Sequence, residues 1–337
     1  MPLTAEKAEL LERVAAALHL SGWQLLWLNA DHPAKARLIK GSQALDAWIH
    51  IWNLTPGGRA KSRPLERRIQ PTGIGDRFRS SPGTRTFILG WSAETNVFAA
   101  FDHGFHKGQI GSSPSIQTDL PALEAAAQDG LGVFAKATGE LSIAVRPNMF
   151  GLYVEQMLAL HASGTSQAQL SLLRRMAEDA LDVGFDEIDA SVPAQRRKVM
   201  TTTLRLLRDR RFSQNVLSAY RHRCAFCEVQ LRLLDAAHIL PVAHSDSDDL
   251  VTNGVALCAL HHRAYDAALV TFDETYSIEI STAAISDLAS AGLDGGVEQF
   301  RAALRPSLLL PKPKANHPSA QMITKANALR GWHGMRG

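Results

Sequence analysis

The chain has 337 residues, of which 45% are hydrophobic and 20% charged, and its formal net charge is +3. This composition is typical of a soluble globular protein and excludes global disorder. The length is sufficient for about two domains of ordinary size. The first residues lack the basic-then-apolar pattern of a signal peptide, and no apolar run reaches the roughly 18 residues of a membrane span, so no membrane association is expected.

The first predicted elements are a helix and a strand. Residues 5–19 follow Thr4, which suits a helix N-cap, and the early acids suit the helix dipole. Residues 46–54 alternate like a strand. A Gly/Pro-rich stretch over 57–85 then carries many basic residues, which would contact phosphates and guanine edges of DNA or instead form a solvated face. These are Arg59, Lys61, Arg63, Arg67, Arg68, Arg77, Arg79 and Arg85.

A β-hairpin is predicted next, with its turn at residues 92–95. Its aromatic residues recur at every second position, which is typical of a core, although such rings can also stack on an extruded base. A helix over 120–128, a strand over 140–147 and a helix over 149–161 complete a predicted domain at residues 1–162, which we interpret as a DNA-recognition domain.

Residues 163–211 are predicted to form a helical connector. Residues 194–223 form one long basic helix in this interpretation, and Arg208, Arg210 and Arg211 are candidate contacts to the DNA backbone. The stretch from 305 to 337 is Pro-rich at its start and is predicted to be a C-terminal tail lying over the surface.

The three cysteines of the chain, Cys224, Cys227 and Cys258, fall in one short region. An odd number of clustered cysteines argues against a disulfide framework and for metal binding in a reducing cytoplasm. Cys224 and Cys227 form one knuckle, and Cys258 and His261 form a second, so that four ligands could hold a structural Zn²⁺ ion. Chance clustering of three small buried cysteines is the alternative.

Three further residues interleave with these ligands: His238 in "AHILP", Asn253 in "TNGVALC" and His262 in "HHRAYD". With the zinc ligands, this order resembles the HNH, or ββα-metal, endonucleases over residues 212–280. The resemblance implies two antiparallel strands that present the first histidine, a loop that holds the asparagine and a helix that carries the last histidine. It also implies that Asn253 fixes the loop that orients His238.

Phosphodiester hydrolysis needs a base that activates water and a cation that neutralises developing charge. His238 is the candidate base, because imidazole titrates near neutral pH. His262 is the candidate ligand of a catalytic Mg²⁺ or Mn²⁺ ion. Many family members have an acidic ligand directly before the first histidine, where this chain has Ala237. Asp235 lies two residues earlier on the same strand face and is the substitute ligand, or else a solvated acid at the strand end.

The sequence therefore predicts a two-domain α+β protein, with a mixed α/β domain followed by a zinc-stabilised HNH nuclease domain at 212–304. The predicted activity is metal-dependent cleavage of double-stranded DNA, in the manner of restriction enzymes, including those that restrict modified DNA. The resemblance implies 5′-phosphate products and a homodimer. Two alternatives stay open, namely a non-catalytic zinc-containing DNA-binding protein and a nuclease for RNA or single-stranded DNA.

Overall fold

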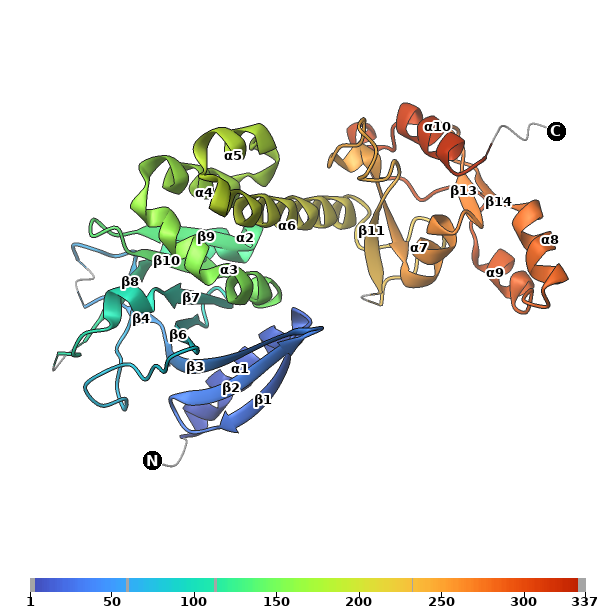
Figure 1. Ribbon diagram of the computed structural model, residues 1–337. Coiled ribbons are helices and arrows are strands. Elements are labelled where there is room, and N and C mark those ends of the chain that lie inside the picture. The colour runs from blue at the N-terminus through green and yellow to red at the C-terminus, as the bar shows by residue number, and fades with distance from the viewer. Residues whose placement is uncertain (1–3, 59–60, 112–113, 232, 333–337) are drawn as a thin grey trace. The chain divides into compact units, whose positions relative to one another are not determined.

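A computed structural model describes residues 4–58, 61–111, 114–231 and 233–332 (Figure 1). The chain divides into two compact units, Met1–Leu207 and Arg208–Gly337. Each unit combines helices and sheets, which confirms the predicted α+β class. Within the described ranges, no helix is both long enough and apolar enough to cross a membrane.

A seven-stranded sheet organises the first unit, in the order β1-β2-β3-β6-β7-β10-β9. The β3–β6 pair is parallel, and the other neighbouring pairs are antiparallel. The β6–β7 hairpin confirms the hairpin predicted from the sequence. The strands are β1 (Gln24–Asn29), β2 (Ala34–Lys40), β3 (Gln43–Asn53), β6 (Arg85–Ser92), β7 (Val97–Phe101), β9 (Leu131–Ala135) and β10 (Leu141–Val145).

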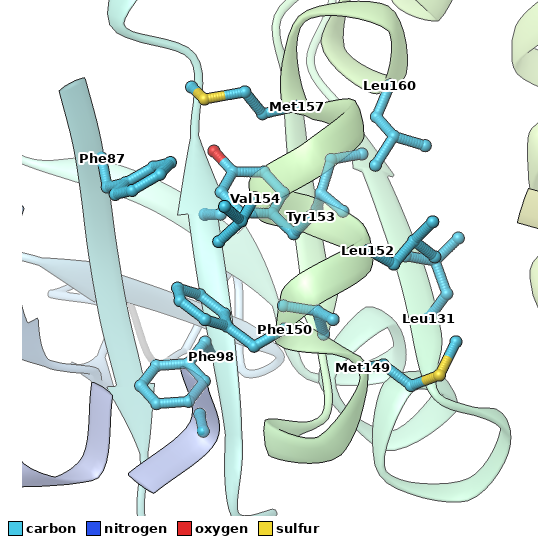
Figure 2. Close-up of a cluster of buried hydrophobic side chains, with 14 of the residues drawn as sticks. Phe87, Phe98, Leu131, Met149, Phe150, Leu152, Tyr153, Val154, Met157 and Leu160 are labelled. Carbon is cyan, nitrogen blue, oxygen red and sulfur yellow. The ribbon is translucent and has the colours of Figure 1, made fainter. Parts of the chain in front are cut away.

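Both faces of this sheet are buried. On β7, Phe98 belongs to the cluster on one face, whereas Val97, Ala99 and Phe101 belong to the cluster on the other. Figure 2 shows the first cluster, in which Phe98 lies among side chains of α3 such as Phe150. The aromatic rings at alternate positions are therefore core residues, and the alternative of exposed stacking platforms is wrong for them.

Helices cover the two faces. Helices α1 (Ala5–Leu20), α3 (Phe150–Ala162) and α4 (Gln167–Glu178) contribute to the first cluster, and Thr4 caps α1 by accepting a hydrogen bond from the Lys7 amide. On the other face lie α2 (Leu120–Asp129) and a small sheet of β4 (Thr55–Pro56), β5 (Glu66–Ile69) and β8 (Ile116–Asp119).

The segment predicted as a connector packs into the first unit. Helix α4, the short helix α5 (Phe185–Ser191) and the first half of α6 (Ala194–Ala219) contribute buried residues to the same cluster as the sheet. The second half of α6 contributes Phe212 and Val216 to a separate core. The amphipathic pattern identified these helices, but it carried no information about which core they would join.

The second unit is built on the β11–β12 pair. Strands β11 (Leu234–His238) and β12 (Gly254–Cys258) are antiparallel, and α7 (Ala259–Asp266) follows directly. A second pair, β13 (Val270–Phe272) and β14 (Ile278–Ile280), precedes α8 (Thr282–Ser290) and α9 (Val297–Ala303). Part of the predicted tail belongs to the core of this unit. Leu308 is buried in that core, and so is Ile323, which lies on α10 (Ala320–Leu329).

Candidate functional site

Four predicted metal ligands converge in the second unit. The ligand atoms of Cys224, Cys227, Cys258 and His261 all lie within 4.8 Å of one another. Nδ1 of His261 is 3.2 Å from Sγ of Cys258 and 3.5 Å from Sγ of Cys224, and the Sγ atoms of Cys227 and Cys258 are 3.9 Å apart. Ligand atoms around a tetrahedral zinc ion, with Zn–S near 2.3 Å, are separated by roughly 3.5–3.8 Å.

The donor set also fits a cation chemically. Burial raises the pKa of the Cys227 thiol to about 12, and burial lowers the pKa of His261. The imidazole is therefore neutral, as a ligand must be, while the thiols need a bound cation to become thiolates at neutral pH. Three sulfurs and one imidazole favour zinc over hard cations such as Mg²⁺. These residues form a site that can hold a metal ion.

The candidate catalytic residues His238, Asn253 and His262 lie on the β11–β12–α7 frame. His238 ends β11 and pairs with Gly254 in the strand register, Asn253 directly precedes β12, and His262 lies on α7. This is the two-strand, loop and helix arrangement that the resemblance implies. Adjacent positions on a helix point about 100° apart, which lets His261 face the cysteines while His262 faces β11.

His238 is held by two contacts. Its ring stacks on that of Phe212 from α6, with centroids 3.7 Å apart and an interplanar angle of 11°. Its Nε2 lies 3.1 Å from Oδ1 of Asp249. The hydrogen bond with His238 keeps the pKa of the Asp249 carboxyl below its ordinary value, and the charge of Arg208 acts in the same direction.

Asn253 is buried, and its amide organises the loop after β11. Its Oδ1 accepts a hydrogen bond from the Leu240 amide at 2.9 Å. Its Nδ2 donates to the Asp248 carbonyl at 2.9 Å and to Oγ of Ser247 at 3.1 Å. The side chain therefore ties the residues just after His238 to those just before Asp249.

His262 lies between two carboxylates. Its Nδ1 is 3.3 Å from Oδ2 of Asp235 on β11, and its Nε2 is 3.5 Å from Oδ2 of Asp266, one turn along α7. Both carboxylates are largely exposed. Asp266 contacts His262 from the same helix and Asp235 contacts it from β11, so each carboxylate could hold a cation together with His262.

The candidate DNA contacts of the first unit differ in their surroundings. Arg67 is mostly buried on β5 and binds Glu94, with Nη2 at 3.1 Å from Oε2. Arg68 is half-buried on the same strand. Arg77 is 65% exposed in its side chain, and Arg79 is exposed beside the Trp48 ring. Arg59 lies outside the described residues.

The candidate DNA contacts of α6 lie on the helix whose Phe212 stacks on His238. Arg208 and Arg210 are half-buried, as is Arg211, and each of the three has interactions within the protein. Arg208 is near enough to Asp249 for its charge to lower the pKa of that carboxyl. Arg208 therefore borders the histidine site, and none of the three is fully exposed.

Sequence reasoning missed Asp249 and Phe212. Asp249 lies in a polar run, "HSDSDD", where acids are normally solvated, and no spacing rule marks it out. Phe212 lies on a helix, 26 residues before His238, in a stretch that reads as an ordinary apolar helix face. Only their tertiary contacts with His238 identify the two residues.

Two regions of the chain match known protein families. Residues 224–273 match the HNH endonuclease family, and residues 45–154 match a family described as methylase-associated X1. Comparison with curated proteins gave no match. A solved structure, "Modification dependent TagI restriction endonuclease", is similar at 12% identity and TM-score 0.29, covering 85% of this chain and 81% of that one. The chain thus carries a methylase-associated X1 domain and, over Cys224–Asp273, an HNH endonuclease domain.

Proposed function

We propose that this protein is a metal-dependent DNA endonuclease of the restriction type, in which the second unit cuts and the first unit reads the DNA. The observation that supports the proposal is the ββα frame that carries His238, Asn253 and His262, together with the Cys3His cluster. The match to the HNH endonuclease family over the same residues supports it.

In the proposed reaction, a water molecule attacks the phosphorus atom and gives its proton to His238. The P–O3′ bond breaks and the O3′ oxygen takes a proton from solvent water, leaving a 5′-phosphate and a 3′-hydroxyl. Asn253 keeps the loop of His238 in place through its bonds to Leu240 and Asp248. His262 would hold Mg²⁺ or Mn²⁺ together with Asp235. The cation supplies charge neutralisation at the leaving oxygen.

The Cys3His cluster has a structural role in this proposal. Four protein ligands leave no open position for substrate, which distinguishes a structural zinc site from a catalytic one. We assign Zn²⁺ to Cys224, Cys227, Cys258 and His261. The ion would fix the start of α7 against the strands and so place His262.

The first unit is proposed to recognise DNA that carries modified bases. Its match to a methylase-associated family supports a connection with DNA methylation. Arg77 and Arg79 flank Phe78, which lines a cavity of about 230 Å³ with Phe105 and His106. Positive charge beside an aromatic-lined cavity suits a nucleic acid, whose phosphates bind arginine and whose bases stack on aromatic rings. Arg68 and Arg67 would contribute to the positive potential.

The arginines of α6 are proposed to contact the DNA backbone. Arg208, Arg210 and Arg211 would contact phosphates next to the scissile bond, which gives salt-sensitive affinity without sequence preference.

A double-strand break needs two cuts, so we propose that two copies act together on double-stranded DNA. Sedimentation of the protein with and without a DNA duplex tests this assembly, and a single copy per duplex would contradict it.

The test is a plasmid-cleavage assay with Mg²⁺ or Mn²⁺. It compares wild type with His238→Ala on plasmid from methylating and non-methylating hosts, and His244→Ala serves as the control. We expect wild type and His244→Ala to cut, and His238→Ala to lose about 10²–10⁴-fold in rate. Cutting only of methylated plasmid supports a reader of modified bases, and cutting only of unmethylated plasmid contradicts it. Cleavage of RNA or single-stranded DNA alone would refute the substrate, and binding without cleavage of any substrate would refute the enzyme.

A further inference from the structure

The His238 ring is fixed in the structure by one apolar and one charged contact. Phe212 stacks on its face at 3.7 Å, and Oδ1 of Asp249 lies 3.1 Å from its Nε2. The side chain of His238 is 12% exposed and that of Asp249 is 23% exposed, so water screens this pair only weakly. The stacking restricts ring tilt, and the carboxylate restricts rotation about the ring axis.

We propose that Asp249 is a positioning residue that holds His238 as the tautomer with its proton on Nε2 and its lone pair on Nδ1. A neutral imidazole has one donor nitrogen and one acceptor nitrogen, and an ionised carboxylate can only accept. The Nε2 atom must therefore donate to Asp249, which leaves Nδ1 as the atom that takes the proton from water. The catalytic consequence rests on the proposed nuclease function, whereas the tautomer does not.

The charge state of Asp249 supports this arrangement. The hydrogen bond from His238 lowers the pKa of the Asp249 carboxyl, and the charge of Arg208 on α6 lowers it further against the opposing effect of burial. The carboxylate is therefore ionised at neutral pH and remains an acceptor. When His238 takes up a proton, the same carboxylate stabilises the imidazolium that forms.

The loop that carries Asp249 is held by the site itself. Nδ2 of Asn253 donates to the carbonyl of Asp248, the residue directly before Asp249, at 2.9 Å. The carboxylate of Asp248 serves the local backbone, because its Oδ1 accepts from the Leu250 amide at 3.1 Å. Asn253 thus positions Asp249 as well as the segment after His238, and Asp248 provides a matched carboxylate one residue away that does not contact the ring.

The first experiment measures the tautomer without relying on cleavage. Full-length, zinc-loaded protein with ¹⁵N-labelled histidine is studied by two-bond ¹H–¹⁵N correlation, and the His238 signal is identified by its loss in His238→Gln. We expect an Nε2-protonated ring in wild type and in Asp248→Asn, and a mixture of tautomers in Asp249→Asn. A wild-type ring protonated on Nδ1, or an Asp249→Asn spectrum identical to that of wild type, would overturn the assignment.

The second experiment measures single-turnover plasmid cleavage as a function of pH. A general base works when it is neutral, so the rate should rise with pH as the base loses its proton. Asp249→Asn removes a negative charge that favours the imidazolium, so the rising limb should move to lower pH and the plateau should fall about 100-fold. Asp248→Asn should keep the wild-type profile, and plasmid binding and zinc content should be unchanged in both variants.

The two experiments separate the possible failures. If wild type does not cut but the tautomer depends on Asp249, the proposed nuclease function fails and the positioning role stands. If wild type cuts and Asp249→Asn matches Asp248→Asn in plateau and pH profile, the positioning role is refuted and the nuclease stands. A fall in rate with an unshifted pH profile, restored by Asp249→Glu, would show that the carboxylate acts on loop structure alone and would also refute it.

Discussion

In the C-terminal unit the candidate site residues come from one short stretch of sequence, whereas in the N-terminal unit the candidate DNA-binding residues lie in separate parts of the fold. Between Cys224 and His262, two strands and one helix turn bring two distinct sites together. In the first unit, Arg67 on β5 pairs with Glu94 in the turn between β6 and β7, while Arg77 and Arg79 lie on a loop. Metal and acid–base chemistry fixes residue types and spacings, but phosphate binding requires only positive charge on a surface.

The units also differ in what stabilises them. The first unit buries both faces of a seven-stranded sheet and has the larger core. The second unit has a smaller core in which Cys224 and Cys258 are themselves buried members. We expect a small domain of this kind to depend on a bound metal for stability, because the ion would stabilise its buried cysteines as thiolates. The two units should therefore respond differently to metal removal and to core substitutions.

The largest expected effect is that of zinc loss on the second unit. Binding of a structural zinc ion contributes about 10–16 kcal/mol in small zinc domains, so Cys224→Ser or strong chelation should abolish the thermal unfolding transition of this unit. The transition of the first unit should remain. Calorimetry together with zinc analysis by mass spectrometry provides the measurement. An unchanged melting profile with full zinc content would contradict the ligand assignment.

Phe98→Ala should destabilise the first unit and leave the unfolding transition of the second unit unchanged. Phe98 is fully buried, with its ring centroid 4.8 Å from that of Trp91 and 5.0 Å from that of Phe150. Truncation should cost the first unit about 3–5 kcal/mol, because it removes buried contacts and leaves a cavity. Calorimetry would follow both transitions. Phe105→Ala is the control, since that ring is 48% exposed and its loss should change stability little. A shift in both transitions would show that the units unfold together.

The two carboxylates beside His262 provide a finer test within the second unit. Asp235→Asn should raise the Mg²⁺ concentration needed for half-maximal cleavage about 10-fold or more, in the range seen when one group that holds or orients a metal is lost. Asp266→Asn should have the smaller effect, because Asp266 mainly braces the helix. Metal titrations of the cleavage rate compare the two. A larger effect for Asp266→Asn would transfer the ligand role to that residue.

The sequence predicted the second unit far better than the first, for a physical reason. Cys224-x2-Cys227 and Cys258-x2-His261 are local spacings, and a tetrahedral ion leaves few ways to satisfy them. The β6–β7 hairpin was likewise local and was predicted. The parallel β3–β6 pairing was not, because parallel pairing joins segments distant in sequence and leaves no turn signal. Strands β1 and β2 were also missed, although both pair with their sequence neighbours in the antiparallel sense. Asp249 was missed because only the folded loop brings it to His238.

The smallest expected effect concerns the arginines of the first unit. Arg77 and Arg79 are exposed, and their loss should weaken binding to a DNA duplex about tenfold at low salt and reduce the slope of log affinity against log salt by about 1–2. Fluorescence anisotropy of a labelled duplex over a salt series measures both. Arg37→Ala is the control, because Arg37 pairs with Asp46 at 2.8 Å, closer than the 3.9 Å between Arg77 and Asp76. An unchanged salt slope would mean that DNA affinity resides in the second unit, where α6 places Arg208 beside the His238 site.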